Sequence, residues 1–208
     1  MKASTSKSAA AKKAANKIRN KPVGKKSAPK PIVSTGYWLV KSEPDVFSYE
    51  MLKAKGAKGE PWTGVRNFLA RNNMRAMSVG DLAFFYHSNI GKEIVGICRV
   101  IAPAHPDPED CTGTWECVDV EAVADLPKPV TLQNVKDNPK LAKMSLVTSM
   151  RLSVQQVTAD EWAEVCRMAS FDPKGVHQIS PGVKEHKRGA RVHRPKRTSP
   201  YLSRPIRC

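Results

Sequence analysis

Several features common in enzymes and membrane proteins are missing from this sequence of 208 residues. No apolar run approaches the length that crosses a bilayer, and no signal-peptide core precedes the first aromatic stretch, so we expect no membrane partner. The five cysteines show no CxxC spacing, and neither His87 nor His105 has a partner at metal-ligand spacing, which argues against a zinc site. The chain also lacks a phosphate-binding glycine loop and a Gly-x-Ser-x-Gly motif. These absences favour a protein that uses no metal and no other cofactor.

Negative charge is almost absent from the two ends of the chain. Residues 1–35 hold ten Lys or Arg and no Asp or Glu, and residues 171–208 hold ten basic residues and two acids. The ends therefore carry +10 and +8 of the net charge of +16, which leaves −2 for residues 36–170. Segments so poor in apolar residues cannot offset the entropy of ordering. We predict one domain over 36–170 between two disordered basic tails, which would attract polyanions without reading their sequence.

Two lysine pairs in the first tail bear on the location of the protein. Lys12-Lys13 and Lys25-Lys26 have the arrangement of a bipartite nuclear import signal, which predicts a nuclear location. The absence of acids also allows a mitochondrial presequence, although lysine in place of arginine speaks against it. A bacterial cytoplasmic or nucleoid protein stays open as well, because the sequence does not settle the organism.

The central region shows short β-branched and aromatic runs separated by turns, a pattern typical of strands. The expected strands are residues 37–41, 82–88, 94–101, 115–124 and 151–155. The run at 82–88 has apolar residues on both faces, which predicts a central strand, and Gly96 predicts a bulge. Loops or connectors are expected at 53–60, 103–113 and 127–129.

Helices are few in the predicted domain. Ser48 can cap a short helix, another short helix is expected at 132–138, and a capping box begins at Thr158. The helix after this box has apolar residues at amphipathic spacing: Trp162, Val165, Cys166 and Ala169. There is no regular alternation of strands and helices. The sequence therefore predicts an α+β domain built on a small, barrel-like sheet of mixed or antiparallel strands.

The stretch from Trp62 to Met77 gathers residue types that suit a nucleic-acid ligand. A tryptophan and Gly64 precede a helix that Asn67 can cap, and Arg71 and Arg75 lie four residues apart on one face. An aromatic wall, a glycine and guanidinium groups fit a flat, polar, phosphate-linked ligand such as a nucleobase. The same residues also fit a surface helix beside a core tryptophan, with solvated arginines.

Four stretches together resemble the EVE domain family: Tyr37–Pro44, Trp62–Asn72, Phe84–Asn89 and Arg151–Val154. They have the order and spacing of that family's motifs over about 36–170, and the tails are not included. The resemblance implies a PUA-like fold, a small β-barrel with flanking short helices. It also implies a pocket for a flipped, often modified base. Modified cytosines in DNA, including hydroxymethylcytosine, are the proposed ligands for this family, and RNA bases are possible.

The expected site has a base-binding part and a phosphate-binding part. Trp62 is the expected stacking wall, with Tyr86 or Trp38 opposite it, because base–aromatic stacking contributes about 1–3 kcal/mol per base. The full set expected at the base is Trp38, Ser42, Glu43, Trp62, Val65, Asn67, Tyr86, His87 and Ser88. The residues expected at flanking phosphates are Arg66, Arg71 and Arg75.

Some of these residues also have structural interpretations. Trp38 fits the core better than a site, Glu43 fits an ion pair that caps the arginine helix, and His87 fits a satisfied structural histidine. Thr63 is a departure from the family, in which many members have an aspartate after the motif tryptophan. Thr63 can accept a hydrogen bond but carries no charge, so the base preference stays open.

Three functions remain after these considerations. The favoured one is a monomeric, non-catalytic reader of a modified base, whose domain supplies recognition and whose tails supply electrostatic affinity. The second is an RNA-binding protein, or a chromatin- or ribosome-associated protein bound through its tails. The third is a small hydrolase of a modified nucleotide that uses Ser42, Glu43, His87 and Ser88 as nucleophile, acid and base.

Overall fold

The computed structural model describes residues 34–177 of the chain. Its framework is a six-stranded sheet with the strand order β2-β5-β4-β3-β1-β6. The strands are β1 (Tyr37–Ser42), β2 (Glu60–Pro61), β3 (Leu82–His87), β4 (Glu93–Pro106), β5 (Glu116–Thr131) and β6 (Val154–Gln156). The pairing of β1 with β3 is parallel, and the other pairs are antiparallel. The predicted first tail, apart from residues 34–35, and its lysine pairs fall outside the described residues. The second tail was predicted to begin at residue 171, but the ordered domain continues further: Lys174–His177 form a short helix, and Val176 is buried in a core cluster.

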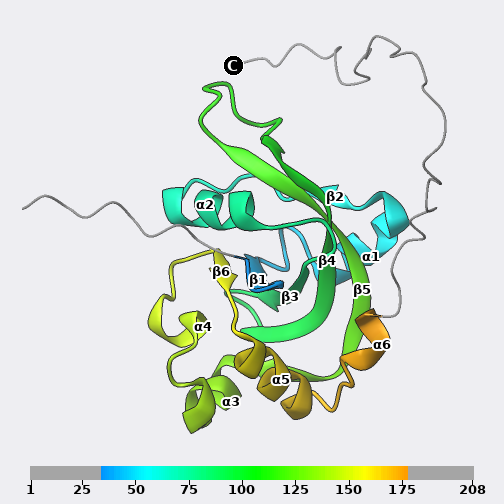
Figure 1. The fold of residues 1–208 in the computed structure, drawn as a ribbon, viewed down its shortest axis with the longest axis vertical. Helices are drawn as coiled ribbons and strands as arrows, with labels where there is room; N and C mark the ends of the chain where they lie inside the picture. Colours follow the sequence, from blue (N-terminus) through cyan, green and yellow to red (C-terminus); the bar gives the residue numbers. More distant parts are fainter. Residues whose placement is uncertain (1–33, 178–208) are drawn as a thin grey trace, which may run out of the picture. The chain divides into compact units, whose positions relative to one another are not determined.

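Short helices surround the sheet (Figure 1). The α-helices are α1 (Tyr49–Lys55), α2 (Phe68–Ala76), α3 (Leu132–Asp137), α4 (Ser145–Thr148), α5 (Ala159–Met168) and α6 (Lys174–His177). Two 3₁₀ turns are η1 (Gly56–Lys58) and η2 (Pro139–Leu141). Across residues 34–177, none of these helices combines the length and the apolar character that crossing a membrane requires.

The two faces of the sheet bury separate hydrophobic clusters, because side chains alternate along each strand. Phe84 of β3 lies in one cluster together with Trp162 of α5. Phe85 lies in the other cluster, with Trp62 and with Met74 of α2. In Figure 1, α2 and α5 accordingly lie on opposite sides of β1 and β3. The predicted central position of β3 is confirmed by its place between β4 and β1.

The bulge predicted at Gly96 is confirmed, and it has a packing reason. The register of β4 shifts between Ile94 and Gly96, against both β3 and β5. The Tyr49 ring lies against Gly96 so closely that a Cβ atom there would be 2.2 Å from a ring carbon. The Tyr49 hydroxyl lies 2.8 Å from the Ile97 carbonyl oxygen and 2.7 Å from that of Ala124. Only glycine lets α1 approach the sheet in this way.

The expected loops and the last strand differ from the structure in several places. Residues 127–129 are not a connector but part of β5, where the ladder to β4 is interrupted between Asp125 and Val130. A proline is tolerated there because an interrupted ladder needs no donor. The expected loop at 103–113 begins later, since β4 continues to Pro106, and the expected loop at 53–60 is partly helical. The last strand is β6, which is shorter than expected at its start.

Candidate nucleic-acid interface

A groove of about 420 Å³ opens between the start of α2 and the segment that leads into β6. Its volume lies in the range of sites that hold small ligands. The lining residues are Asn67, Leu69, Val147, Thr148, Ser149, Met150, Arg151 and Leu152. Arg151 is the one charged residue among them, and its guanidinium has no hydrogen-bond or ion-pair partner within residues 34–177. The groove thus combines apolar walls, hydroxyl groups and one free cation.

Long-range hydrogen bonds hold the segment before β6 in position. The backbone N–H of Lys41 donates to Ser153 O (2.9 Å), and the Lys41 Nζ donates to Met150 O (3.0 Å). Burial lowers the pKa of Lys41 to about 8. The buried Gln155 Nε2 donates to the carbonyls of Ser149 and Leu152, both at 3.0 Å. One wall of the groove is therefore fixed by β1 and by a buried amide.

The other wall begins at the cap of α2. The Asn67 Oδ1 accepts hydrogen bonds from the backbone N–H groups of Leu69 (2.9 Å) and Ala70 (3.0 Å), which confirms the predicted cap. Inside the helix, the Asn73 Nδ2 donates to Val154 O at 2.7 Å and so joins α2 to β6. Because both walls are tied to the same short strand, the groove is built into the fold.

The predicted serines and histidine lie where the parallel strands β1 and β3 end. The Ser42 Oγ donates to Phe47 O (2.7 Å), and the Ser88 Oγ donates to Ser42 O (3.1 Å). The His87 Nε2 accepts the backbone N–H of Tyr49 at 3.2 Å, and burial lowers the pKa of His87. No hydrogen bond between a serine hydroxyl and His87 occurs in the described part of the chain. These contacts fix the turn after β1 and leave the hydrolase arrangement without its nucleophile–base pair.

Another group with the composition of a nucleophile, base and acid lies on β4 and β5. The His105 Nε2 lies 2.8 Å from an Asp119 oxygen, and the Cys117 Sγ lies 3.6 Å from the His105 Nδ1. Cys117 is fully buried, and this burial raises the pKa of its thiol to about 12. A thiol that stays protonated and has no access to substrate is not a nucleophile.

The aromatic residues predicted to hold the base are mostly buried. Trp38 is fully buried and donates from Nε1 to an Asp81 oxygen at 2.8 Å, which supports its core interpretation. Trp62 is 7% exposed and packs edge-on against Phe85 at 5.4 Å between ring centroids. Tyr86 lies in the cluster on the opposite face of the sheet from Trp62. Tyr86 therefore cannot form the second wall of a sandwich with Trp62.

Val65 and Glu43 complete the predicted base contacts. Val65 is buried in the same cluster as Trp62. Glu43 is exposed, and its backbone carbonyl accepts from the N–H groups of Val46 and Phe47, both at 2.9 Å. The alternative interpretation of Glu43 as an ion-pair cap of α2 has no support, because none of the ion pairs in 34–177 includes its carboxylate.

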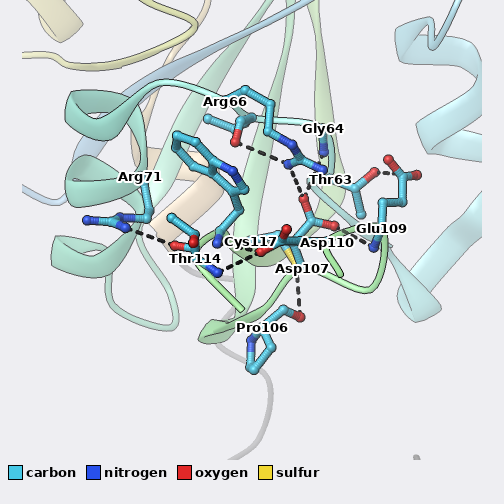
Figure 2. A network of polar contacts seen from close by, with 12 residues as sticks. Thr63, Gly64, Arg66, Arg71, Pro106, Asp107, Glu109, Asp110, Thr114 and Cys117 are labelled. Carbon is cyan, nitrogen blue, oxygen red and sulfur yellow. Dashed lines mark hydrogen bonds and ion pairs between the residues drawn. The ribbon is translucent and has the colours of Figure 1, made fainter. Parts of the chain in front are cut away.

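The three predicted phosphate-binding arginines all have partners at the end of the β4–β5 hairpin, and Figure 2 shows two of them, Arg66 and Arg71. The Arg66 Nη1 lies 2.6 Å from an oxygen of Asp107, whose side chain is buried. Arg71 donates to Thr114 O at 2.8 Å. Arg75 binds Glu116 through two nitrogens at 2.5 and 2.8 Å. These contacts hold the hairpin loop to α2 and offset the charges of Arg66 and Arg75.

Asp107 also shapes the turn that precedes α2. One of its oxygens accepts the backbone N–H of Gly64 (3.1 Å), and the other accepts that of Glu109 (2.8 Å). Gly64 has a φ of 78°, a conformation that favours glycine. Figure 2 shows the Thr63 hydroxyl beside Glu109, to which it donates at 2.9 Å. Thr63, which stands where many family members have an aspartate, thus helps to hold the β4–β5 hairpin loop against the turn before α2.

Sequence reasoning missed the exposed residues around the groove. Phe68 is 60% exposed, Leu69 is 52% exposed and Met150 is 62% exposed. The signal for Phe68 and Leu69 was present, because both lie off the apolar stripe that packs α2 on the sheet. Arg151 opens one of the four stretches that resemble the EVE family, but that stretch was interpreted as a strand. For Met150 no signal was available, since its place in an irregular segment depends on distant hydrogen bonds.

Residues 36–168 match the EVE domain. The chain belongs to the EVE domain family. Over 171 residues it is 33% identical to mouse thymocyte nuclear protein 1, which covers 67% of this chain and 76% of the relative. Similarity to the EVE domain thus extends over the sheet and both walls of the groove.

Solved structures of EVE relatives have the same fold. A crystal structure of an Agrobacterium tumefaciens protein has a TM-score of 0.63 and 62% identity, over 65% of this chain and 93% of that chain. The structure of human THYN1 in complex with 5-methylcytosine containing DNA has a TM-score of 0.60 and 34% identity, over 66% of this chain and 99% of that chain. The predicted α+β, PUA-like fold is thereby confirmed.

Proposed function

We propose that this EVE domain protein is a non-catalytic reader that holds a flipped, modified cytosine of DNA in the groove between α2 and the segment before β6. The observation that carries the proposal is the groove itself. It offers apolar surface for a base and a free guanidinium, Arg151, for a phosphate. A relative, human THYN1, is known in complex with 5-methylcytosine containing DNA, which supports the choice of ligand.

The chemistry of the groove suits an extruded base. Flipping a base out of a duplex costs a few kcal/mol, and contacts in the pocket must offset this cost. Leu69 and Leu152 supply apolar contact, and the hydroxyls of Thr148 and Ser149 can bond to a polar edge. A contact between Arg151 and the backbone would position the strand without reading its sequence.

The proposal changes the role of the expected aromatic wall. Trp62 lies in the core and supports the loop before α2. The residues that would touch the base are Asn67 and Leu69, which line the groove. The partly buried Ser42, Ser88 and His87 hold the turn between β1 and α1 and do not line the groove. No catalytic step is proposed, because the serine hydroxyls and His87 are engaged with backbone groups.

We further propose a nuclear location, supported by the name of the relatives, thymocyte nuclear protein 1. The fold itself does not require a nucleus, since the Agrobacterium relative shares it. A fusion of the full chain to a fluorescent protein, compared with a variant in which Lys12, Lys13, Lys25 and Lys26 are alanine, tests this part separately.

The decisive experiment measures binding of the full chain to matched oligonucleotides at one salt concentration. The cytosine is plain, methylated or hydroxymethylated, in DNA and in RNA. We expect a preference for a modified cytosine in DNA. Leu69→Glu should weaken that binding about tenfold or more, because it removes apolar contact and places a carboxylate near phosphate.

Met51→Glu is the matched control, because Met51 is 45% exposed on α1 and does not line the groove. It makes the same change of charge and should leave binding unchanged. Equal weak binding to all oligonucleotides, unaffected by Leu69→Glu, would instead indicate binding through the basic tails, with a steep salt dependence.

A further inference from the structure

An exposed aromatic ring stands directly beside the groove. Phe68, the first residue of α2, is 60% exposed, although phenylalanine is usually buried. Its neighbours in the chain, Asn67 and Leu69, both line the groove. Phe68 therefore lies one residue away from the proposed base-binding surface, and the packing of α2 on the sheet does not need it.

The ring of Phe68 is held in place on its inner side. Its centroid lies 5.0 Å from that of Trp115, and the Arg71 Cζ lies 5.0 Å from the Phe68 ring centroid. Arg71 is itself fixed by its hydrogen bond to Thr114 O. A side chain that is already ordered loses little conformational entropy when it binds. This arrangement presents a rigid apolar surface to the solvent.

The charges around this surface suit a phosphate-flanked partner. The Arg71 guanidinium lies 5.9 Å from the Trp115 ring centroid, and the Arg66 guanidinium, at 5.8 Å, is already paired with Asp107. The nearby carboxylate of Asp110 is engaged by the backbone N–H groups of Thr114 and Trp115. Arg71 has no ion-pair partner within 34–177, and Arg151 lies on the groove.

We propose that Phe68 is a wedge that enters a DNA duplex at the position from which the base has been extruded. This inference rests on the proposed function and deepens it, because it assigns the residue that holds the duplex open at the extruded base. An extruded base leaves a gap in the stack, and apolar side chains commonly fill such gaps. Successive residues of a helix point about 100° apart around its axis. One residue can thus face the gap while its neighbour faces the base.

The test compares a duplex that carries one 5-methylcytosine with the same strand alone, using the full chain and fluorescence anisotropy. Phe68→Ala should weaken duplex binding about tenfold and single-strand binding less than about twofold, because only a duplex has a gap to fill. Phe68→Leu should retain most of the duplex affinity. Val79→Ala, a truncation at a site 57% exposed in a turn outside the groove, should change neither.

A fluorescent 2-aminopurine placed next to the methylcytosine gives a second readout. Wild-type protein should raise its emission by unstacking it, and Phe68→Ala should reduce this rise at saturating protein. Equal weakening of duplex and single strand, or no weakening, would overturn the wedge. The proposed function fails separately, if the wild-type protein shows no preference for the modified base even in the single strand.

Discussion

The helices α2 and α5 cover opposite faces of the same sheet, and they do so in different ways. On α5, Trp162 stacks on Phe84 at 3.9 Å between centroids and on Tyr37 at 4.6 Å. On α2, the residues that face the sheet are the smaller Ala70 and Met74. The largest apolar side chains of α2, Phe68 and Leu69, instead face the solvent.

This difference separates stability from recognition. Apolar surface that is buried stabilises the fold, whereas apolar surface that stays exposed beside a groove is available for a ligand. Within residues 34–177, no large exposed apolar side chain belongs to α5. The comparison teaches that one face of the sheet is closed by its helix, whereas the helix on the other face also presents exposed apolar side chains at the groove that we propose as the binding surface.

The largest expected effect is on α5. Trp162→Ala should lower the free energy of unfolding by about 3–5 kcal/mol, because it removes a buried ring from two stacks. Phe68→Ala on α2 should change it by less than about 0.5 kcal/mol, as is usual at exposed sites. Urea unfolding followed by tryptophan fluorescence and by circular dichroism measures both. A similar loss of unfolding free energy in both variants would show that Phe68 supports the fold as much as Trp162 does, which contradicts the difference drawn between the two helices.

The N-caps of α2 and α5 allow a second comparison of the two helices, because each cap stabilises its own helix in the same way. Asn67 caps α2, and Thr158 caps α5 through a capping box with Glu161. Replacing either cap by alanine should cost about 1 kcal/mol of stability. Only Asn67→Ala should also weaken binding of the modified oligonucleotide, since Asn67 lines the groove. Thr158→Ala is the matched control, and equal binding by both variants would remove Asn67 from the interface.

The caps also show which parts of the fold were predictable. Ser48, Asn67 and Thr158 cap their helices as expected, because a cap depends on residues two or three positions away. The full length of β4 and β5 was not predictable. The two prolines beside Lys128 indicate a connector locally. The chain stays extended as part of β5, and the prolines are tolerated because they lie where β5 makes no ladder hydrogen bonds to β4.

Of the twelve residues predicted to contact the base or the phosphates, only Asn67 lines the candidate groove. The motif from Trp62 to Asn67 does lead to one wall of the groove. However, Arg66 and Arg75 pair with acidic residues 41 positions further along the chain, and no local sequence pattern predicts such partners. The other wall depends on Gln155 and Lys41, which hold an irregular segment in place.

The smallest expected effect is a pH dependence on the α2 side of the sheet. His87 packs edge-on against Phe85 at 5.6 Å, and its Nε2 accepts the N–H of Tyr49. Burial lowers the pKa of His87 below its ordinary value of 6.5, although Glu93 opposes this shift. The folded state therefore binds the proton less readily than the unfolded chain. The contribution of His87 to stability is present above about pH 6.5 and is lost as the pH falls through the lowered pKa.

Urea unfolding of the wild-type protein and of His87→Gln at several pH values between 7 and 5 measures this contribution. A glutamine oxygen can still accept the N–H of Tyr49 but does not titrate in this range, so the variant should lose less stability as the pH falls. Hydrogen bonds from Arg167 and Asn138 lower the pKa of Glu164 on α5 from 4.5 to about 2. Its contribution to stability is therefore lost only as the pH falls below about 4.5, outside the measured range, and it is the same in both proteins. Parallel curves for the two proteins would show that His87 is free to accept a proton. In that case the hydrogen bond to Tyr49 would not hold the turn between β1 and α1.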